Sequence, residues 1–377
     1  MKGAVLDRQS NETTRYSEVV LSDIIQQVHS PAMGPSDNLY VIGITGTNGK
    51  TTVAHLIGEV LRSAGYHPYV LGTLNSGNRD LSTPELKDTL RLMEQHLEDG
   101  GTHFVMEVTS EGIDQARVRG IHFDVKVLTN ITQDHLDYHK TIERYRNAKL
   151  SFMMEGSGFK IFPDQFKQEN IGFTTQLLGE FNHLNIQAAA SVLRHVGISE
   201  HYIQASLSSC LPPKGRLENI ELGQPFMVLV DYAHTTDGLE NVLGTVKQIA
   251  EGRSGRLLVM FGCGGDRDCE KRPLMGKIAS TLADVLVITD DNPRSESCSK
   301  ITAEIIGGIS RSCFKYSVIH DRKTAIEYII NYSRPRDVVI LIGKGHEAYQ
   351  ILKDKVIHFD DVEVATSTIR SQICAEA

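Results

Sequence analysis

Short apolar runs alternate with longer segments of helical periodicity along most of the chain, from residue 40 onward. In the first half the pattern predicts strands over 39–44, 102–108 and 125–130 and helices over 51–64, 84–98, 142–153 and 185–196. In the second half it predicts strands over 227–232, 257–262, 285–289 and 338–343 and helices over 236–251, 271–282, 299–309 and 323–333. Strands that alternate with helices of this length indicate an α/β fold with mostly parallel sheets.

Changes in this pattern divide the chain into three predicted parts. Residues 1–39 are polar and weakly periodic, with room for one short helix over 17–28, and are too few for an independent core. A Pro-Pro-Lys-Gly hinge then separates residues 40–211 from residues 212–377, where a second strand and helix series begins. We therefore expect a short N-terminal arm, a P-loop-type domain with a mostly parallel sheet, and a Rossmann-like α/β domain.

The composition narrows the class of protein. The chain has 377 residues, of which 40% are hydrophobic and 23% charged, as in an ordinary globular protein. Its net charge of −8 argues against a general nucleic-acid or anionic-membrane binder. No apolar run reaches 18 residues, the first residues lack the apolar core of a signal peptide, and the six cysteines form no CxxC pair. These features predict a cytosolic protein with neither nucleic acid nor membrane as a partner.

A glycine-rich turn follows the first predicted strand and opens the first predicted helix. Its glycines would let backbone N–H groups converge on an anion at the helix N-terminus. Lys50 would reach the β- and γ-phosphates of a nucleotide, and the Thr51 hydroxyl would bind Mg²⁺. The alternative is a capped turn with Lys50 in solvent. One departure from the general P-loop pattern is Ile44, which stands where that pattern has a glycine. The predicted ATP-binding loop comprises Gly46, Thr47, Asn48, Gly49, Lys50, Thr51 and Thr52.

Acidic and imidazole groups follow the next two predicted strands. Glu107 lies near the end of strand 102–108, and the segment 134–139 reads Asp-His-Leu-Asp-Tyr-His after strand 125–130. Ligand sites in open α/β sheets lie at the carboxyl ends of strands, so these groups would face the phosphates. Mg²⁺ takes few ligands from protein and completes its shell with phosphate and water oxygens. The alternatives are a helix-capping role for Glu107 and surface histidines at positions 135 and 139.

The Gly-Thr-Asn-Gly-Lys-Thr-Thr loop resembles the ATP-binding loop of the Mur ligase family, which includes the folylpolyglutamate synthetases. Three later motifs, Phe-Gly-Cys-Gly-Gly-Asp-Arg-Asp at 261–268, Asp-Asn-Pro-Arg at 291–294 and Gly-Lys-Gly-His-Glu at 343–347, narrow the resemblance. They are similar to the branch that adds the third stem residue of peptidoglycan, and within it to the meso-diaminopimelate ligases. The resemblance covers roughly residues 40 to 360.

This resemblance implies a cytoplasmic, monomeric ligase that adds meso-diaminopimelate to the D-glutamate of a UDP-N-acetylmuramoyl-dipeptide. ATP would first phosphorylate the acceptor carboxylate, and the amine would then displace phosphate to form an amide. The implied small-molecule partners are ATP, the nucleotide-sugar peptide and the diamino acid, with two Mg²⁺ ions as cofactors. The implied catalytic residues are Lys50, Glu107, His135 and Lys149, and the implied metal ligands are Thr51, Glu107, His135 and Lys149 as a carbamate.

The resemblance also implies the remaining contacts with substrates. The Arg294 guanidinium would pair bidentately with the distal carboxylate of diaminopimelate, which marks this specificity in the family. The nucleotide would also contact Asn182, Asn185, Arg216 and Asp231. The acceptor would contact Ser82, Thr83, Pro84, Ser110, Gln115 and Arg117. The incoming amino acid would contact Arg272, Asn292, Arg294, Gly343 and Glu347.

Three features depart from the family and leave alternatives open. The uridine-binding N-terminal region is represented by only 39 residues, the stretch between Lys149 and Gly179 is shorter, and the family's Ser-Ser-His reads Thr109-Ser110-Glu111. A Mur-like ligase with a different or uridine-free peptide acceptor is therefore one alternative. A folylpolyglutamate-synthetase-like ligase, a non-catalytic nucleotide-binding scaffold and a plain P-loop ATPase or GTPase switch are the others.

Overall fold

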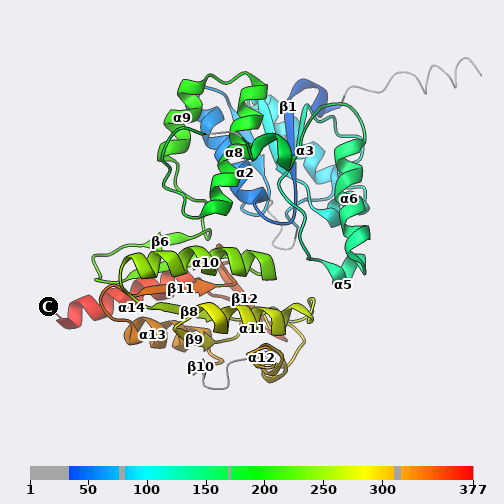
Figure 1. Ribbon diagram of the computed structural model, residues 1–377. Helices are drawn as coiled ribbons and strands as arrows, with labels where there is room; N and C mark the ends of the chain where they lie inside the picture. Colours follow the sequence, from blue (N-terminus) through cyan, green and yellow to red (C-terminus); the bar gives the residue numbers. More distant parts are fainter. Residues whose placement is uncertain (1–33, 76–80, 169–170, 310–315, 377) are drawn as a thin grey trace, which may run out of the picture.

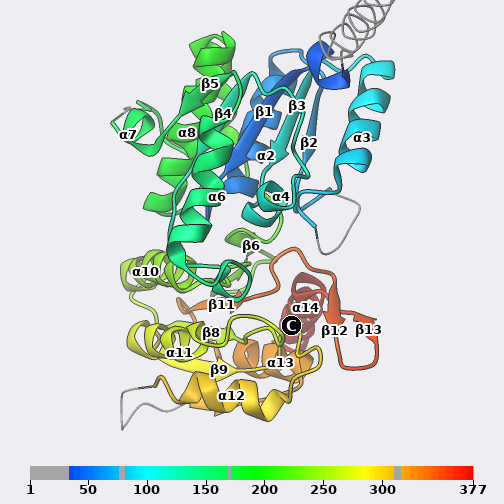
Figure 2. The same cartoon turned by 90° about the vertical axis from the view of Figure 1, so that its right-hand side faces the viewer.

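The computed structural model describes residues 34–75, 81–168, 171–309 and 316–376. The helix predicted over residues 17–28 lies outside this part of the chain. Two sheets, each covered by helices on both faces, lie one above the other (Figure 1, Figure 2). The predicted α/β fold class is confirmed. Within the described residues, no helix is both long and apolar enough to cross a membrane.

The first sheet has five parallel strands in the order β2-β3-β1-β4-β5. Its strands are β1 (Tyr40–Thr45), β2 (Pro68–Leu71), β3 (His103–Glu107), β4 (Val125–Leu128) and β5 (Phe159–Ile161). Ile44 pairs with Glu107, and Thr45 pairs with Leu128, so the three central strands end side by side. After β1 the chain continues to β2 on one side of the sheet, and after β4 it continues to β5 on the other side. This divergence opens a crevice between the ends of β1 and β4 for the loop after β1.

Both faces of this sheet are covered, which explains why its strands read as continuous apolar runs. Ile42 and Ile44 of β1 face one core with helices α2 (Lys50–Ser63), α8 (Glu180–Val196) and α9 (Glu200–Ser209). Val41 faces a second core with α3 (Leu86–Glu98) and α6 (Ile142–Met154). Four shorter helices, η1 (Pro35–Asn38), α4 (Ser110–Asp114), α5 (Leu136–His139) and α7 (Pro163–Phe166), complete this part.

The second sheet has six strands in the order β10-β9-β8-β11-β7-β6, and only the edge strand β6 runs antiparallel to its neighbour. The strands are β6 (Glu218–Ile220), β7 (Met227–Asp231), β8 (Leu257–Phe261), β9 (Val285–Ile288), β10 (Tyr316–Val318) and β11 (Val338–Ile342). Helices α10 (Thr236–Gly252), α11 (Lys271–Leu282) and α12 (Cys298–Ile306) cover one face. Helices α13 (Arg322–Tyr332) and α14 (Asp361–Glu376) cover the other, and β12 (Tyr349–Ile351) pairs with β13 (Val356–His358) as a hairpin.

Most predicted elements are present within a few residues of the expected bounds. The clearest differences are α8, which begins at Glu180 rather than at residue 185, and α12, which ends at Ile306 rather than at residue 309. Short strands and the helices α9 and α14 were not predicted. The expected boundary between residues 211 and 212 falls in a stretch without helix or strand between α9 and β6. The division into domains at that point stays a prediction.

Candidate active site

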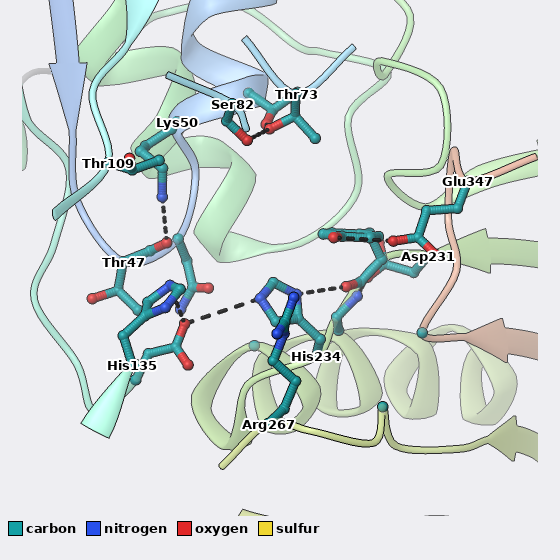
Figure 3. A pocket seen from close by; sticks show the side chains of 18 of the residues that line it. Thr47, Lys50, Thr73, Ser82, Thr109, His135, Asp231, His234, Arg267 and Glu347 are labelled. Atoms are coloured by element: carbon teal, nitrogen blue, oxygen red, sulfur yellow. Dashed lines mark hydrogen bonds and ion pairs between the residues drawn. The ribbon is translucent and has the colours of Figure 1, made fainter. Parts of the chain in front are cut away.

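A cavity of about 470 Å³ lies between the two sheets and is lined by residues from both. The phosphate-loop side and the C-terminal side face each other across it (Figure 3). Of the predicted site residues, those that line it are Thr47, Asn48, Gly49, Lys50, Thr51, Thr52, Ser82, Glu107, Gln115, Arg117, His135, Asn182, Asn185, Arg216, Asp231, Asn292, Arg294, Gly343 and Glu347. Those outside the lining are Gly46, Thr83, Pro84, Ser110, Lys149 and Arg272.

The loop between β1 and α2 requires its two glycines. Gly46 has φ +146°, and a Cβ there would lie 1.9 Å from the Thr129 hydroxyl oxygen. Gly49 has φ +90°, and a Cβ there would lie 2.3 Å from the Asn185 side-chain oxygen. Any other residue at either position would therefore push the loop away from its neighbours. The close approach also puts Asn185 of α8 directly against the phosphate loop.

Lys50 is folded back onto the loop that carries it. Its Nζ donates to the carbonyl oxygens of Gly46 at 2.8 Å and Thr47 at 2.9 Å. Burial lowers the pKa of Lys50, although the nearby Glu107 and Asp134 carboxylates favour the charged form. The amine therefore lies at the cavity wall beside the backbone that would surround a phosphate.

Thr73, which was not predicted as a site residue, links three predicted ones. The buried Glu107 accepts hydrogen bonds from the Thr73 backbone N–H at 2.8 Å and from its hydroxyl at 3.0 Å. The same hydroxyl lies 3.4 Å from the Thr51 hydroxyl and 2.8 Å from the Ser82 hydroxyl. Oxygen atoms of the phosphate loop, of the end of β3 and of the predicted acceptor loop therefore all lie within hydrogen-bond distance of Thr73. Figure 3 shows its contact with Ser82.

His135 lies between two carboxylates. Its Nδ1 is 2.6 Å from Oε1 of Glu111, and its Nε2 is 3.3 Å from Oδ2 of Asp134. Burial opposes the charged imidazole, but the Glu111 hydrogen bond and the two negative charges outweigh it and raise the pKa of His135. On the C-terminal side, Nε2 of His234 approaches the same Asp134 oxygen at 4.0 Å, so Asp134 is a contact between the two sides of the cavity.

Lys149 of α6 is buried just behind the phosphate loop. Its Nζ donates to the Gly46 carbonyl oxygen at 2.9 Å and lies 4.6 Å from the centre of the Tyr145 ring. The Tyr145 hydroxyl in turn lies 2.8 Å from the Thr47 hydroxyl. Burial, with help from the nearby Lys50 charge, lowers the pKa of Lys149 well below its ordinary value. Among the described residues no carboxylate forms an ion pair with this amine.

The predicted nucleotide residues form two groups on the cavity wall. Asn185 donates through Nδ2 to Oδ1 of Asn182 at 3.0 Å, which holds both amides against the phosphate loop. Arg216 lies over the Tyr232 ring at 4.5 Å and reaches the Thr51 hydroxyl at 3.4 Å. Asp231 at the end of β7 accepts from the backbone N–H groups of 217 and 233, and burial raises the pKa of its carboxyl.

The predicted acceptor residues divide into lining and supporting ones. Ser82, Gln115 and Arg117 line the cavity, and Arg117 donates to the Thr83 carbonyl oxygen at 3.1 Å. Thr83 is fully buried. Its hydroxyl donates to the Glu107 carbonyl oxygen at 3.0 Å, which links the predicted acceptor loop to the end of β3. Pro84 is buried beside it, and Ser110 is 1% exposed with its hydroxyl 3.1 Å from Glu111. Their direct contact with an acceptor stays a prediction.

The loops after β9 and β11 form a compact polar pocket on the C-terminal side. Glu347 accepts from Asn292 Nδ2 at 2.8 Å and from Lys344 Nζ at 3.1 Å. Burial and the nearby Asp291 charge raise the pKa of Glu347. Gly343 has φ +115°, and a Cβ there would lie 2.5 Å from the Asp291 carboxylate, so this turn also depends on glycine.

Arg272 lies outside the cavity lining, and its contact with the incoming amino acid stays a prediction. Its side chain is fully buried, and its guanidinium contacts Glu296 at 2.7 Å, Glu304 at 2.6 Å and the Gly264 carbonyl oxygen at 3.0 Å. These partners take up both terminal nitrogens of the guanidinium, while the buried Nε has no hydrogen-bond partner. Arg267, five residues earlier, is exposed and lines the cavity (Figure 3). The motif at 261–268 was the signal that could have identified it.

Comparisons with known proteins show which family the chain resembles. The Mur ligase middle domain matches residues 44–162, and the Mur ligase glutamate ligase domain matches residues 215–345. The chain is 38% identical to the UDP-N-acetylmuramoyl-L-alanyl-D-glutamate–2,6-diaminopimelate ligase of Geobacillus kaustophilus over 90% of this chain and 80% of that protein. It is 36% identical to the same-named ligase of Syntrophomonas wolfei, with the same coverage.

Solved structures give the same result. A UDP-N-acetylmuramoyl-L-alanyl-D-glutamate–2,6-diaminopimelate ligase is similar with a TM-score of 0.57 and 30% identity, over 89% of this chain and 79% of that one. A bifunctional folylpolyglutamate synthase/dihydrofolate synthase solved with Mn, AMPPNP and L-glutamate shares the fold, with a TM-score of 0.63 and 16% identity over 81% of this chain and 87% of that one. The protein therefore belongs to the Mur ligase family.

Proposed function

We propose that the protein is an ATP-dependent ligase that joins meso-diaminopimelate to the D-glutamate of UDP-N-acetylmuramoyl-L-alanyl-D-glutamate. The observation that carries this is that one and the same cavity is lined by the phosphate loop of the first sheet and by Asn292, Arg294 and Glu347 of the second. A ligase needs its nucleotide, acceptor and amine in one enclosed space, because the acyl phosphate must meet the amine before water. The names of the relatives at 36–38% identity support this choice of substrates.

In the first step an oxygen of the acceptor carboxylate attacks the γ-phosphorus of ATP, the bond to the β-phosphate oxygen breaks, and ADP leaves. Backbone N–H groups of the loop around Gly49 would hold the phosphates. Lys50 would exchange its two carbonyl partners for phosphate oxygens and offset the charge of the transferring group. Asn182, Asn185 and Asp231 would hold the nucleoside.

In the second step the amine nitrogen attacks the acyl carbon, inorganic phosphate leaves, and the amine loses a proton. On the C-terminal side Arg294 would pair with the distal carboxylate of diaminopimelate, and the exposed Arg267 would offer a second cation. Glu347 would attract an ammonium group of the substrate. The separation of anion-binding and cation-binding groups in one pocket fits a diamino acid that carries two carboxylates.

The residues at the phosphate loop fit a Mg²⁺ ion. Thr51 and Glu107 supply hard oxygen donors that meet at the Thr73 hydroxyl, and Mg²⁺ prefers such donors. The described residues contain no ready-made group of three or more His, Cys, Asp or Glu side chains for a metal, so phosphate and water oxygens would complete the shell. Thr51 and Glu107 would hold the two ions, together with His135 once its ring gives up a proton and frees a nitrogen from Glu111 or Asp134. When bound, Mg²⁺ neutralises charge on the phosphoryl group.

Carbamylation of Lys149 is part of the proposal. An amine reacts with CO₂ only when uncharged, and the buried position of Lys149 favours that form. The carbamate would supply an anionic oxygen pair behind the loop, where the amine now contacts the Gly46 carbonyl oxygen. A cytosolic location and a monomeric state stay predictions.

The test is ADP release with mass analysis of the product. Purified protein would receive ATP, Mg²⁺ and either meso-diaminopimelate or lysine, with the L-Ala-D-Glu dipeptide either free or on UDP-N-acetylmuramate. We expect a diaminopimelate adduct of the UDP-linked acceptor and much slower use of lysine. If only the free dipeptide gives product, the acceptor in the proposal must be revised to a peptide without the uridine nucleotide. A parallel reaction would receive folate and glutamate instead, and product from that pair alone, or no amide with any pair, would refute the proposal.

A further inference from the structure

The two largest fully buried side chains in the described part of the protein are Arg272 and Arg322. Arg322 is the first residue of α13, and it pairs with Asp361, the first residue of α14. Nε of Arg322 lies 2.8 Å from one Asp361 oxygen and Nη2 lies 2.6 Å from the other, so the pair is bidentate. Both side chains have no solvent exposure.

The same guanidinium reaches the backbone of two different loops. Nη2 donates to the Ile342 carbonyl oxygen at 3.0 Å, and Nη1 donates to the Asp290 carbonyl oxygen at 3.4 Å. Ile342 is the last residue of β11 and directly precedes the loop 343–347. Asp290 lies two residues after β9 and directly precedes Asp291 and the loop that carries Asn292 and Arg294. One side chain therefore joins the bases of both loops of the amine pocket.

Stability alone gives little reason for this arrangement. A buried ion pair contributes little net stability, because desolvation offsets the attraction, and apolar residues of similar volume often do as well. A guanidinium does what apolar residues cannot, since its planar fork fixes several acceptors at set distances. Here the acceptors are one carboxylate and two loop carbonyls. The spacing of the two loops is thereby tied to a rigid group.

We infer that Arg322, held in place by Asp361, is a positioning residue that sets the distance between the loops 290–294 and 343–347 and thereby the amine specificity of the ligase. The inference rests on the proposed function, because the amine pocket is assigned there. Neither residue lines the cavity, so both act through the loops. A shift of the loops would move Arg294 and Glu347 relative to each other, and with them the carboxylate and ammonium sites.

The protein contains a second arginine–aspartate pair, suitable as a control, at the opposite edge of the same sheet. Arg256 directly precedes β8, Asp337 directly precedes β11, and their side chains meet at 2.6 Å. Asp337 is nearly buried, as Asp361 is, but this pair lies at the amino ends of the strands and does not line the cavity. Its loss should cost stability without reaching the amine pocket.

The experiment compares wild-type protein with the double variant Arg322→Met/Asp361→Leu, the conservative variant Arg322→Lys and the control Arg256→Met. The double variant replaces both buried charges by apolar side chains, so it avoids an unpaired charge and should remain folded. Thermal midpoints, KM for each substrate, and the ratio of kcat/KM for meso-diaminopimelate over lysine are measured for each. Amide hydrogen exchange of residues 290–294 and 343–347 is measured in parallel.

In the double variant we expect KM for the amine to rise roughly 10- to 100-fold, the scale of a small misplacement in a site. KM for ATP should stay within a factor of about two, the amine ratio should fall, and exchange in the two loops should rise. For Arg322→Lys we expect an amine KM, an amine ratio and loop exchange between those of the double variant and wild type. Arg256→Met should lower only the thermal midpoint. An unchanged amine KM and unchanged exchange in a folded double variant would overturn the inference. A wild-type protein that makes no amide would refute the proposed function instead, and the exchange data would still decide the positioning role.

Discussion

Nδ1 of His135 lies 2.6 Å from Oε1 of Glu111, and the second Glu111 oxygen lies 3.1 Å from the Ser110 hydroxyl. The family that the sequence resembles has a histidine where this chain has Glu111. With a carboxylate there, the imidazole has a fixed partner on one ring nitrogen, while Asp134 approaches the other. This chain therefore holds its histidine by an ion pair, and both partners line the cavity.

Replacing Glu111 by Gln should weaken the hold on His135. The amide cannot balance the charged ring, so we expect the free energy of unfolding to fall by about 0.5–1 kcal/mol, a small value because the histidine is 39% exposed. In 1 M salt the difference in unfolding free energy between wild type and the variant should be smaller, because screening already weakens the ion pair in wild type. Urea denaturation at low and high salt measures it. Glu59→Gln, which breaks an exposed helix pair with Arg62, is the control and should change less.

Arg267 and Arg272 should respond differently to the same substitution. Arg272→Met removes the buried cation between Glu296 and Glu304 and leaves them only the exposed Lys300, so we expect the free energy of unfolding to fall by roughly 3 kcal/mol at pH 7. Arg267→Met removes an exposed side chain, so stability should stay within about 0.5 kcal/mol. Turnover with a diamino acid should nevertheless fall. Equal loss of stability in both variants would contradict this division of roles.

The Arg272 effect also has a pH signature. The hydrogen bond from Arg272 lowers the pKa of Glu296 to about 2 from the ordinary 4.5. A depressed carboxyl pKa stabilises the fold above the unfolded value, and this contribution is lost as pH falls through the folded value. The stability difference between wild type and Arg272→Met should therefore be full above pH 4.5 and decrease between pH 4.5 and pH 2. A difference that grows toward acid would contradict it.

The sequence predicted the long elements well, because a strand buried on both faces and a helix of three or more turns leave a clear apolar pattern. The strands β5, β6 and β10 have three residues each, too few for any period to be seen. Strand β2 was also missed, and with it Thr73, whose contact with Glu107 depends on the pairing of β2 with β3. A contact across 34 residues has no local signal.

The same difference between local patterns and long-range contacts explains which site residues could be predicted. Motifs place a residue near a ligand, but they do not tell which side chain of a motif faces the cavity. Arg267 lies within the motif at 261–268 and Arg272 lies four residues after it, and only the packing of α11 against α12 decides that the second is buried beside two glutamates. An arginine is rarely buried, so a sequence reading places it at the surface by default.

Arg294 is the residue on which the choice of amine should depend. Arg294→Lys keeps the charge but removes the planar fork, so kcat/KM for meso-diaminopimelate should fall by about 100-fold if the distal carboxylate is bound bidentately. Use of lysine, which lacks that carboxylate, should change by less than about threefold. Steady-state kinetics with both amines measures this. An equal loss for the two amines would show that Arg294 holds something other than the distal carboxylate.

Lys149 offers a test that does not depend on turnover alone. Burial and the Lys50 charge lower its pKa below the ordinary 10.5, so a larger fraction of the amine is uncharged and able to add CO₂ near neutral pH. In ¹³C-bicarbonate we expect a carbamate resonance that Lys149→Met lacks. Depletion of CO₂ should lower wild-type turnover, and acetate should partly restore turnover of the variant.

Lys126 is the matched control for this experiment. It is also a buried lysine, with Nζ donating to the Phe152 carbonyl oxygen at 3.0 Å and lying 4.8 Å from the centre of the Phe152 ring, and burial lowers its pKa as well. It does not line the cavity. Lys126→Met should therefore keep both the carbamate resonance and the bicarbonate dependence. If the resonance disappears with Lys126 and persists without Lys149, burial alone selects the modified lysine, and the carbamate has no place at the phosphate loop.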